Sequence, residues 1–110
     1  MNEKKYYAYI VTSDSGTLYI GVTSNLRVRV MQHKHGKFDG FSKEYGCNRL
    51  VYWEGFDDVT QAIHREKQLK GWRRSKKIGL IETKNPRWED LAEKWGAEMV
   101  FAREPIAGRD

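Results

Sequence analysis

The stretch that decides the fold covers residues 6–33 and reads YYAYIVTSDSGTLYIGVTSNLRVRVMQH. Residues 6–12 and 17–23 are rich in aromatic and β-branched side chains, a composition typical of strands. The Asp-Ser-Gly sequence at 14–16 favours a turn, because glycine tolerates a positive φ. The stretch therefore predicts a β-hairpin. Gly21 lies inside the second strand, where a glycine indicates a bulge or a close approach to the backbone.

A helix is expected directly after the hairpin, capped by Ser24 or Asn25 and continuing to about His35. Arg29 and His33 are four positions apart, so the two side chains share one face of this helix. The sequence thus places a cation and an imidazole side by side, next to the hairpin.

Downstream of a loop at 36–48, the sequence predicts one further strand and three further helices. An Asn-Pro pair at 85–86 is a helix start signal, because asparagine caps helices and proline fits the first helical position. The expected elements are a strand at 49–56, a long helix at 59–72, a short helix at 78–82 and a last helix from Asn85 to Trp95.

Length and composition indicate one α+β domain. The chain has 110 residues, of which 39% are hydrophobic and 32% are charged, as in ordinary globular proteins. We expect a three-stranded antiparallel sheet flanked by helices over residues 1–85. Residues 86–110 are expected to form a C-terminal helix and tail that pack on the same domain.

The sequence also limits the compartments in which the protein is expected. Cys47 is the only cysteine, which excludes a disulfide, or a zinc site built from several cysteines, within one chain. The N-terminal apolar run is too short for a signal peptide, and no run approaches the roughly 18 apolar residues that a membrane span requires. We therefore expect a cytoplasmic protein with no membrane partner.

Positive charge is concentrated in the first three quarters of the chain. Residues 1–81 carry 15 Lys and Arg against 8 Asp and Glu, whereas residues 82–110 carry 5 against 7. The basic segment at 64–77, HREKQLKGWRRSKK, places Trp72 among seven cations. Cations and a flat ring suit nucleic acid, and a solvated helix face with Trp72 in the core is the simpler interpretation. We expect Trp72 to point inward and the cations outward; the candidate phosphate ligands are Lys67, Lys70, Arg73, Arg74, Lys76 and Lys77.

Glu66 is the most informative position in the second half of the chain. It falls on the apolar stripe of the long helix, three residues after Ile63 and three before Leu69. A carboxylate on a core-facing stripe is costly unless it is paired or binds a metal. The alternative is a glutamate at the edge of the stripe that is solvated or paired with a neighbouring Arg or Lys.

The hairpin resembles that of the GIY-YIG nuclease family, whose two signature tripeptides lie on neighbouring strands. The second signature is complete here, as Tyr19-Ile20-Gly21. Tyr7-Ala8-Tyr9 stands in the place of the first signature and keeps its tyrosine, Tyr9. The spacing of about ten residues across a turn also fits the family hairpin.

Three further positions match the family pattern. Arg29 matches the helical arginine that follows the second signature, and His33 matches a histidine found one turn later in some members. Glu66 matches the metal-binding glutamate on a later helix. The resemblance covers residues 5–85, and the sequence from Asn85 to Leu91 is similar to that of small stand-alone bacterial members.

The resemblance implies an endonuclease that uses Mg²⁺ (or Mn²⁺) to hydrolyse DNA phosphodiester bonds in repair or recombination. In this scheme Glu66 binds the metal and Arg29 presents a planar cationic fork to the scissile phosphate. Tyr19 accepts a proton from the attacking water, and Tyr9 positions the water or Tyr19. A free phenol has a pKa of about 10, so Tyr19 requires nearby positive charge. His33, with an ordinary pKa of about 6.5, is the alternative base.

Two other classes of function fit parts of the sequence. A non-catalytic nucleic-acid-binding module would keep the fold and bind through the basic segment. A protein-interaction domain would use Trp88 and Trp95. DNA is the expected substrate of the nuclease, with RNA as the alternative. The small size of the chain favours structure-selective or nonspecific cleavage over recognition of a sequence.

Overall fold

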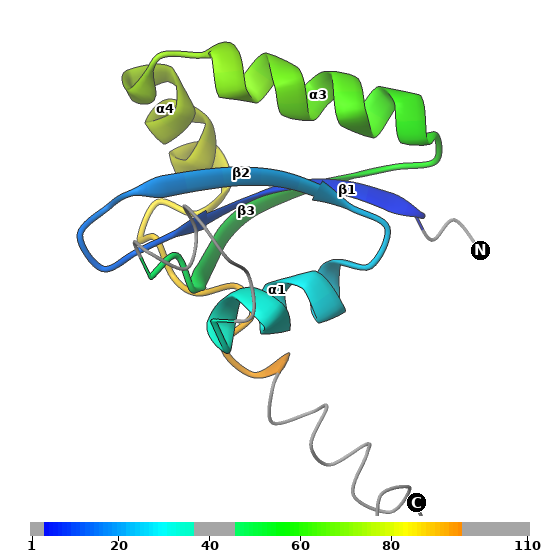
Figure 1. Cartoon of the computed structure of the whole chain (residues 1–110). Coiled ribbons are helices and arrows are strands. Elements are labelled where there is room, and N and C mark those ends of the chain that lie inside the picture. The colour runs from blue at the N-terminus through cyan, green and yellow to red at the C-terminus, as the bar shows by residue number, and fades with distance from the viewer. Residues whose placement is uncertain (1–3, 37–45, 96–110) are drawn as a thin grey trace, which may run out of the picture.

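A computed structural model describes residues 4–36 and 46–95. It shows an α+β fold, as the sequence predicts, with a three-stranded antiparallel sheet and helices on both of its faces (Figure 1). In the described part of the chain, no helix has the length and apolarity needed to cross a membrane. The elements are β1 (Tyr6–Thr12), β2 (Leu18–Thr23), α1 (Leu26–Lys34), β3 (Arg49–Phe56), α3 (Val59–Gly71) and α4 (Arg74–Lys84).

The strand order is β2-β1-β3, so the first strand of the chain is the central one. It pairs antiparallel with both neighbours. Tyr9 lies opposite Gly21 on β2 and opposite Trp53 on β3. The predicted hairpin is confirmed, and its register brings both signature tripeptides to one place in the sheet.

The two faces of the sheet are covered by different helices. In Figure 1, α1 lies on one face, while α3 and α4 lie on the other. Tyr9 and Val11 pack with Leu26 and Val30 on the α1 side. Ile10, which points the other way, joins a second cluster that includes Leu69 of α3 and Ile81 of α4. β1 is therefore buried on both faces, which explains its continuous run of apolar residues.

The helix boundaries refine the expectations from sequence. Asn25, rather than Ser24, caps α1, because its side chain accepts a hydrogen bond from the backbone N–H of Val28. The long helix ends at Gly71, close to the expected position. The next helix begins at Arg74, four residues earlier than expected, and ends at Lys84.

The expected helix start at Asn85 is wrong. Asn85 instead caps the C-terminus of α4, and its side chain is buried. Its Nδ2 donates to the carbonyl oxygens of Val51 (3.1 Å) and Glu89 (2.9 Å), while its Oδ1 accepts from the backbone N–H of Glu89 (3.0 Å). The amide therefore ties the chain to β3. The remainder of the predicted C-terminal helix and tail, residues 96–110, lies outside the described residues.

Residues 86–95 are fastened to the sheet by Asp90. Its Oδ1 accepts hydrogen bonds from the backbone N–H groups of Leu50 (3.1 Å) and Ala92 (3.0 Å). Its Oδ2 pairs with Lys34 of α1. The backbone N–H of Leu91 donates to the carbonyl of Leu50 at 2.8 Å. We infer that this segment belongs to the same domain as the sheet.

Candidate active site

The centre of the site is a buried contact between a phenol and an imidazole. The hydroxyl oxygen of Tyr9 lies 2.9 Å from Nε2 of His33. Tyr9 is fully buried and His33 is 5% exposed. The two rings meet at 65° with their centroids 5.6 Å apart. Strand β1 thus supplies the phenol, and the last turns of α1 supply the imidazole.

Gly21 makes room for the Tyr9 ring. A Cβ at position 21 would lie 2.4 Å from the Tyr9 hydroxyl oxygen and 2.5 Å from its Cζ. Real Cβ atoms essentially never come this close to another heavy atom. The strand glycine therefore marks a close approach, one of the two possibilities that its position in the sequence suggests, and the second signature is built to receive the tyrosine of the first.

Tyr19 and Arg29 complete this side of the site. The half-buried Tyr19 ring lies 5.2 Å from the His33 ring, tilted by 58°. Arg29, one turn before His33 on α1, interacts with Tyr9 through its charge and a hydrogen bond. The hairpin and α1 thus bring four of the five predicted catalytic side chains together.

Burial sets the protonation state of the central pair. It raises the pKa of the Tyr9 phenol well above the ordinary value of 10, with a further rise from Tyr19, while Arg29 opposes the shift. Burial also lowers the pKa of His33 to about 4, and the positive charge of Arg29 adds to this effect. Near neutral pH, Tyr9 is therefore a neutral phenol whose hydroxyl is hydrogen-bonded to Nε2 of a neutral His33.

Glu66 reaches the site from the opposite face of the sheet. It lies on α3, is 8% exposed, and its carboxylate contributes to the raised pKa of Tyr9. Its Oε2 lies 2.6 Å from Nζ of Lys70, one turn further along the helix. The pairing with a neighbouring lysine is one of the alternatives that the sequence leaves open for a carboxylate on an apolar stripe.

A single carboxylate fits a particular kind of metal site. Among the residues that the structure describes, no three or more His, Cys, Asp and Glu gather in a way that would enclose an ion. Mg²⁺ and similar hard cations keep most of their waters and take one or two carboxylates plus substrate phosphates. The donor set around Glu66 fits this behaviour. The Lys70 side chain is 55% exposed, so it can leave the carboxylate without unpacking the core.

The basic segment lies along α3 and the start of α4. Trp72 packs against the cluster on that face of the sheet, with Lys76 Nζ 4.3 Å and the Arg65 guanidinium 5.2 Å from its ring centroid. Trp72 therefore points inward, as expected. Arg74 donates to the carbonyl of Gly16 at 2.7 Å. Of the candidate phosphate ligands, Lys77 is half-buried and the others are exposed: Lys67, Lys70, Arg73, Arg74 and Lys76.

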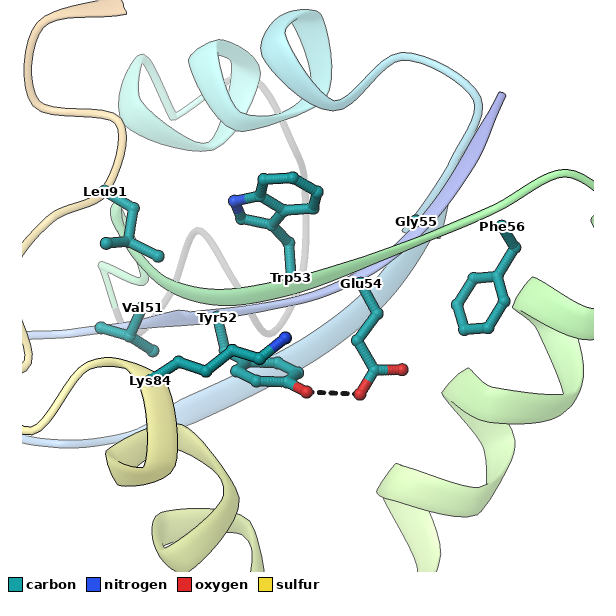
Figure 2. A pocket seen from close by; sticks show the side chains of 8 residues that line it. All are labelled: Val51, Tyr52, Trp53, Glu54, Gly55, Phe56, Lys84 and Leu91. Atoms are coloured by element: carbon teal, nitrogen blue, oxygen red, sulfur yellow. Dashed lines mark hydrogen bonds between the residues drawn. The ribbon is translucent and has the colours of Figure 1, made fainter. Parts of the chain in front are cut away.

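A polar network beside β3 is not predicted by the sequence; Figure 2 shows two of its members, Tyr52 and Glu54. Arg65 donates to both carboxylate oxygens of Glu54, at 2.9 and 2.8 Å, and Glu54 also accepts from the Tyr52 hydroxyl. Burial and the Glu54 carboxylate raise the pKa of Tyr52 to about 12. A hollow of about 460 Å³ lies at this edge, and none of the predicted catalytic residues lines it. The network ties β3 to α3 and is separate from the site.

The fold is that of a nuclease-type domain. The family model described as the GIY-YIG catalytic domain matches residues 5–79, and the chain belongs to the GIY-YIG family. More particularly, it is similar to UPF0213 proteins, a small group of this type. The GIY-YIG family implies nucleic-acid binding, and its nucleases generally use divalent metals.

Two relatives and one solved structure show the extent of this similarity. A UPF0213 protein of Staphylococcus saprophyticus is 36% identical over 77 residues, covering 70% of this chain and 94% of the relative. One from Staphylococcus haemolyticus is 36% identical over 78 residues, covering 71% and 95%. The solution NMR structure of a UPF0213 protein from Bacillus halodurans has a TM-score of 0.52 and 29% identity, covering 81% of this chain and 94% of that one.

Proposed function

We propose that the protein is a metal-dependent endonuclease that hydrolyses DNA phosphodiester bonds, with structure-selective or nonspecific cleavage in repair or recombination. The observation that carries the proposal is that four further side chains with usable chemistry lie close enough to Tyr9 to bond to it or to shift its pKa. These are Tyr19, Arg29, His33 and Glu66. The proposed place of action is the cytoplasm.

Tyr19 is the proposed proton acceptor for the attacking water. His33 is poorly suited to this role, because its Nε2 is hydrogen-bonded to the Tyr9 hydroxyl and its pKa of about 4 makes it a weak base. Tyr9 itself stays protonated, since burial raises its pKa. The hydrogen bond between Tyr9 and His33 instead fixes the imidazole ring, and Tyr19 packs against this ring.

Charge at the scissile phosphate is the second part of the proposed mechanism. The Arg29 guanidinium offers a planar fork of donors that matches two phosphate oxygens. Glu66 would hold Mg²⁺ or Mn²⁺, which supplies positive charge for the phosphate and lowers the pKa of a bound water when present. Lys70, released from Glu66, is then available for a neighbouring phosphate.

Glu66→Gln tests this proposal. The variant keeps the size of the side chain but removes the carboxylate charge, so metal-dependent cleavage is expected to disappear while the far-UV circular dichroism spectrum and most DNA binding remain. Labelled duplex, single-stranded, flap and four-way-junction DNA would be incubated with Mg²⁺ or with chelator. Glu93→Gln, which removes an exposed carboxylate elsewhere, is the matched control and is expected to cut like the wild type.

The outcomes separate the proposal from a binding module. Metal-dependent cutting that is lost in Glu66→Gln and kept in Glu93→Gln supports the nuclease, and the preferred substrate narrows its process. If Glu66→Gln cuts as fast as the wild type, Glu66 is not the metal ligand of the nuclease. Binding without cutting, equal in all three proteins, favours a nucleic-acid-binding module of the same fold.

A further inference from the structure

A second hollow lies on the α1 side of the sheet, next to the candidate active site. It has a volume of about 400 Å³, within the range of sites for small ligands. It lies between the ends of β1 and β3 and the first turn of α1, and the predicted catalytic residues do not line it. We call it the aromatic pocket; its principal residues are Lys4, Tyr7, Asn25, Arg27, Trp53 and Trp95.

Gly55 leaves room for two side chains that line the aromatic pocket, those of Lys4 and Tyr7. This residue lies opposite Tyr7 in the sheet. A Cβ at position 55 would lie 2.6 Å from Cγ and 2.8 Å from Cβ of Lys4, and 3.4 Å from the Tyr7 ring. The Tyr7 hydroxyl donates to the Lys4 carbonyl at 2.8 Å. The missing side chain thus lets the Lys4 stem and the Tyr7 ring close over β3 and shape the pocket.

Trp53 exposes part of its apolar ring to solvent beside Tyr7. The two rings meet edge to face, with centroids 5.8 Å apart and planes at 72°. Trp53 is 39% exposed, so part of its ring is available to a ligand. Its side chain projects from β3 toward the α1 side, away from Tyr52 and Glu54 (Figure 2).

Two cations and a third aromatic ring also line the aromatic pocket. The Arg27 guanidinium lies 4.9 Å from the centroid of the Trp95 ring. Lys4 pairs with Asp57 at 3.5 Å, an exposed contact that a phosphate can replace. Aromatic faces that stack bases, interleaved with cations that meet phosphates, form the usual platform for unpaired nucleic acid.

The pocket is one step along the sheet from the candidate active site. Tyr7 precedes Tyr9 by two residues on the same face of β1, a separation of about 7 Å at the usual rise of a strand. Trp53 lies directly opposite Tyr9 in the register. A nucleotide whose phosphate contacts Arg29 therefore has a neighbour within reach of the aromatic pocket.

We propose that the aromatic pocket binds the base of an unpaired nucleotide that adjoins the scissile phosphate. The base stacks on Trp53, with Tyr7 as the side wall, and Arg27 and Lys4 meet the flanking phosphates. This inference rests on the proposed function and gives it a substrate class: strands with unpaired nucleotides, such as flaps, rather than continuous duplex.

The test is a binding measurement in the presence of chelator, which needs no catalysis. Fluorescence anisotropy would give Kd values for labelled oligothymidylate, for an abasic oligonucleotide of the same length and for a blunt hairpin duplex. Trp53→Ala is expected to bind oligothymidylate about 5- to 150-fold more weakly, the usual range for one stacked base. Trp53→Phe keeps a stacking ring and is expected to stay close to the wild type. Val59→Ala, at an equally exposed apolar position on α3, is the matched control.

Two further readouts separate stacking from a general loss of structure. The wild type is expected to prefer oligothymidylate over the abasic strand, and this preference should vanish in Trp53→Ala while duplex binding is unchanged. Arg27→Gln should reduce the salt slope of single-strand binding by roughly 0.7, whereas Trp53→Phe should leave it unaltered. An oligouridylate arm, run beside oligothymidylate, shows whether the base comes from DNA or RNA.

Specific results would overturn the proposal. Binding of oligothymidylate by Trp53→Ala within twofold of the wild type contradicts it, as does a wild type that binds abasic and base-carrying strands equally. A failure of the proposed nuclease activity would look different. In that case neither the wild type nor Glu66→Gln would cut DNA, while both would still bind single strands in a way that depends on Trp53. If the circular dichroism spectrum showed that Trp53→Ala does not fold, the proposal would be judged on two other results. These are the preference of the wild type for oligothymidylate over the abasic strand, and the affinity of Trp53→Phe for oligothymidylate.

Discussion

His33 is a buried imidazole that is neutral in the folded protein. Its folded-state pKa of about 4 lies below the ordinary value of 6.5, so the unfolded chain binds the proton first as the pH falls. The free energy of unfolding therefore contains a contribution that is present above pH 6.5 and is lost progressively as the pH falls toward 4. The full difference corresponds to about 3 kcal/mol.

Urea unfolding of the wild type and His33→Gln between pH 7 and pH 5 measures this contribution. The range stays above the ordinary pKa values of the carboxyl groups, which destabilise the fold at lower pH. The wild type is expected to lose roughly 1.5–2 kcal/mol across this range. His33→Gln, which can still accept a hydrogen bond from Tyr9 but does not titrate, should lose much less. Equal losses in both proteins would contradict the assignment of a neutral buried His33.

Gly21 and Gly79 provide a matched pair for a second prediction at the scale of single residues. Gly21→Ala places a methyl group against the Tyr9 ring, so the ring must move and the free energy of unfolding should fall by about 1–3 kcal/mol. Gly79 lies in α4, and a Cβ there would meet no heavy atom of the described structure within 4 Å. Gly79→Ala should therefore stabilise the protein by up to about 1 kcal/mol. Thermal unfolding of both variants checks the difference in sign.

At the scale of elements, Asn85 joins the end of α4, the following segment and β3. Asn85→Ala removes three hydrogen bonds and leaves the Val51 carbonyl without this donor, so the free energy of unfolding should fall by about 2–3 kcal/mol. Asn85→Asp keeps the acceptor for the Glu89 N–H but turns a buried carboxylate oxygen toward two carbonyl oxygens, so a loss at least as large is expected. Equilibrium unfolding in urea measures both. An Asn85→Ala variant with the same free energy of unfolding as the wild type would show that Asp90 and the core contacts hold residues 86–95 in place without Asn85.

The elements also show where sequence reasoning succeeds and where it ends. The hairpin and the positions of Arg29 and His33 follow from local patterns, because turns, strands and helix faces are set by neighbours in the chain. The role of Asn85 does not, since its partner Val51 lies 34 positions away and the Asn-Pro pair reads locally as a helix start. The aromatic pocket depends on the register of β1 with β3, which brings Tyr7 and Gly55 together.

The protonation states of the site residues could not be predicted from the sequence either. An isolated histidine with an ordinary pKa is a better base than a phenol, so the sequence leaves the roles of Tyr19 and His33 open. The structure changes this balance through burial and the charge of Arg29, both of which require the packed α1–β1 interface. The family resemblance thus indicates which residues to consider for the site, while their protonation depends on what covers them.

At the scale of the whole molecule, the basic segment is expected to control the salt dependence of DNA binding. Each cation that neutralises a phosphate of duplex DNA contributes about 0.9 to the slope of log K against log salt. Lys67→Gln combined with Arg73→Gln should therefore reduce the slope by about 1.8. Arg87→Gln, at an exposed cation outside the segment, should leave the slope unchanged. Anisotropy titrations with the hairpin duplex at several salt concentrations provide the measurement, and equal slopes in all proteins would place the phosphate contacts elsewhere.

The order of the strands also has a kinetic consequence. Tyr9, Tyr19, Arg29 and His33 lie on the hairpin and the helix that follows it, so these groups assemble through contacts that are short in sequence and quick to form. Glu66 joins them only when α3 docks on the far face of the sheet, and α3 lies beyond β3 in the chain. A nascent or partly folded chain can therefore hold the phenol and imidazole in place while it still lacks the carboxylate. The proposed ability to cut DNA would then be the last property that the folding chain acquires.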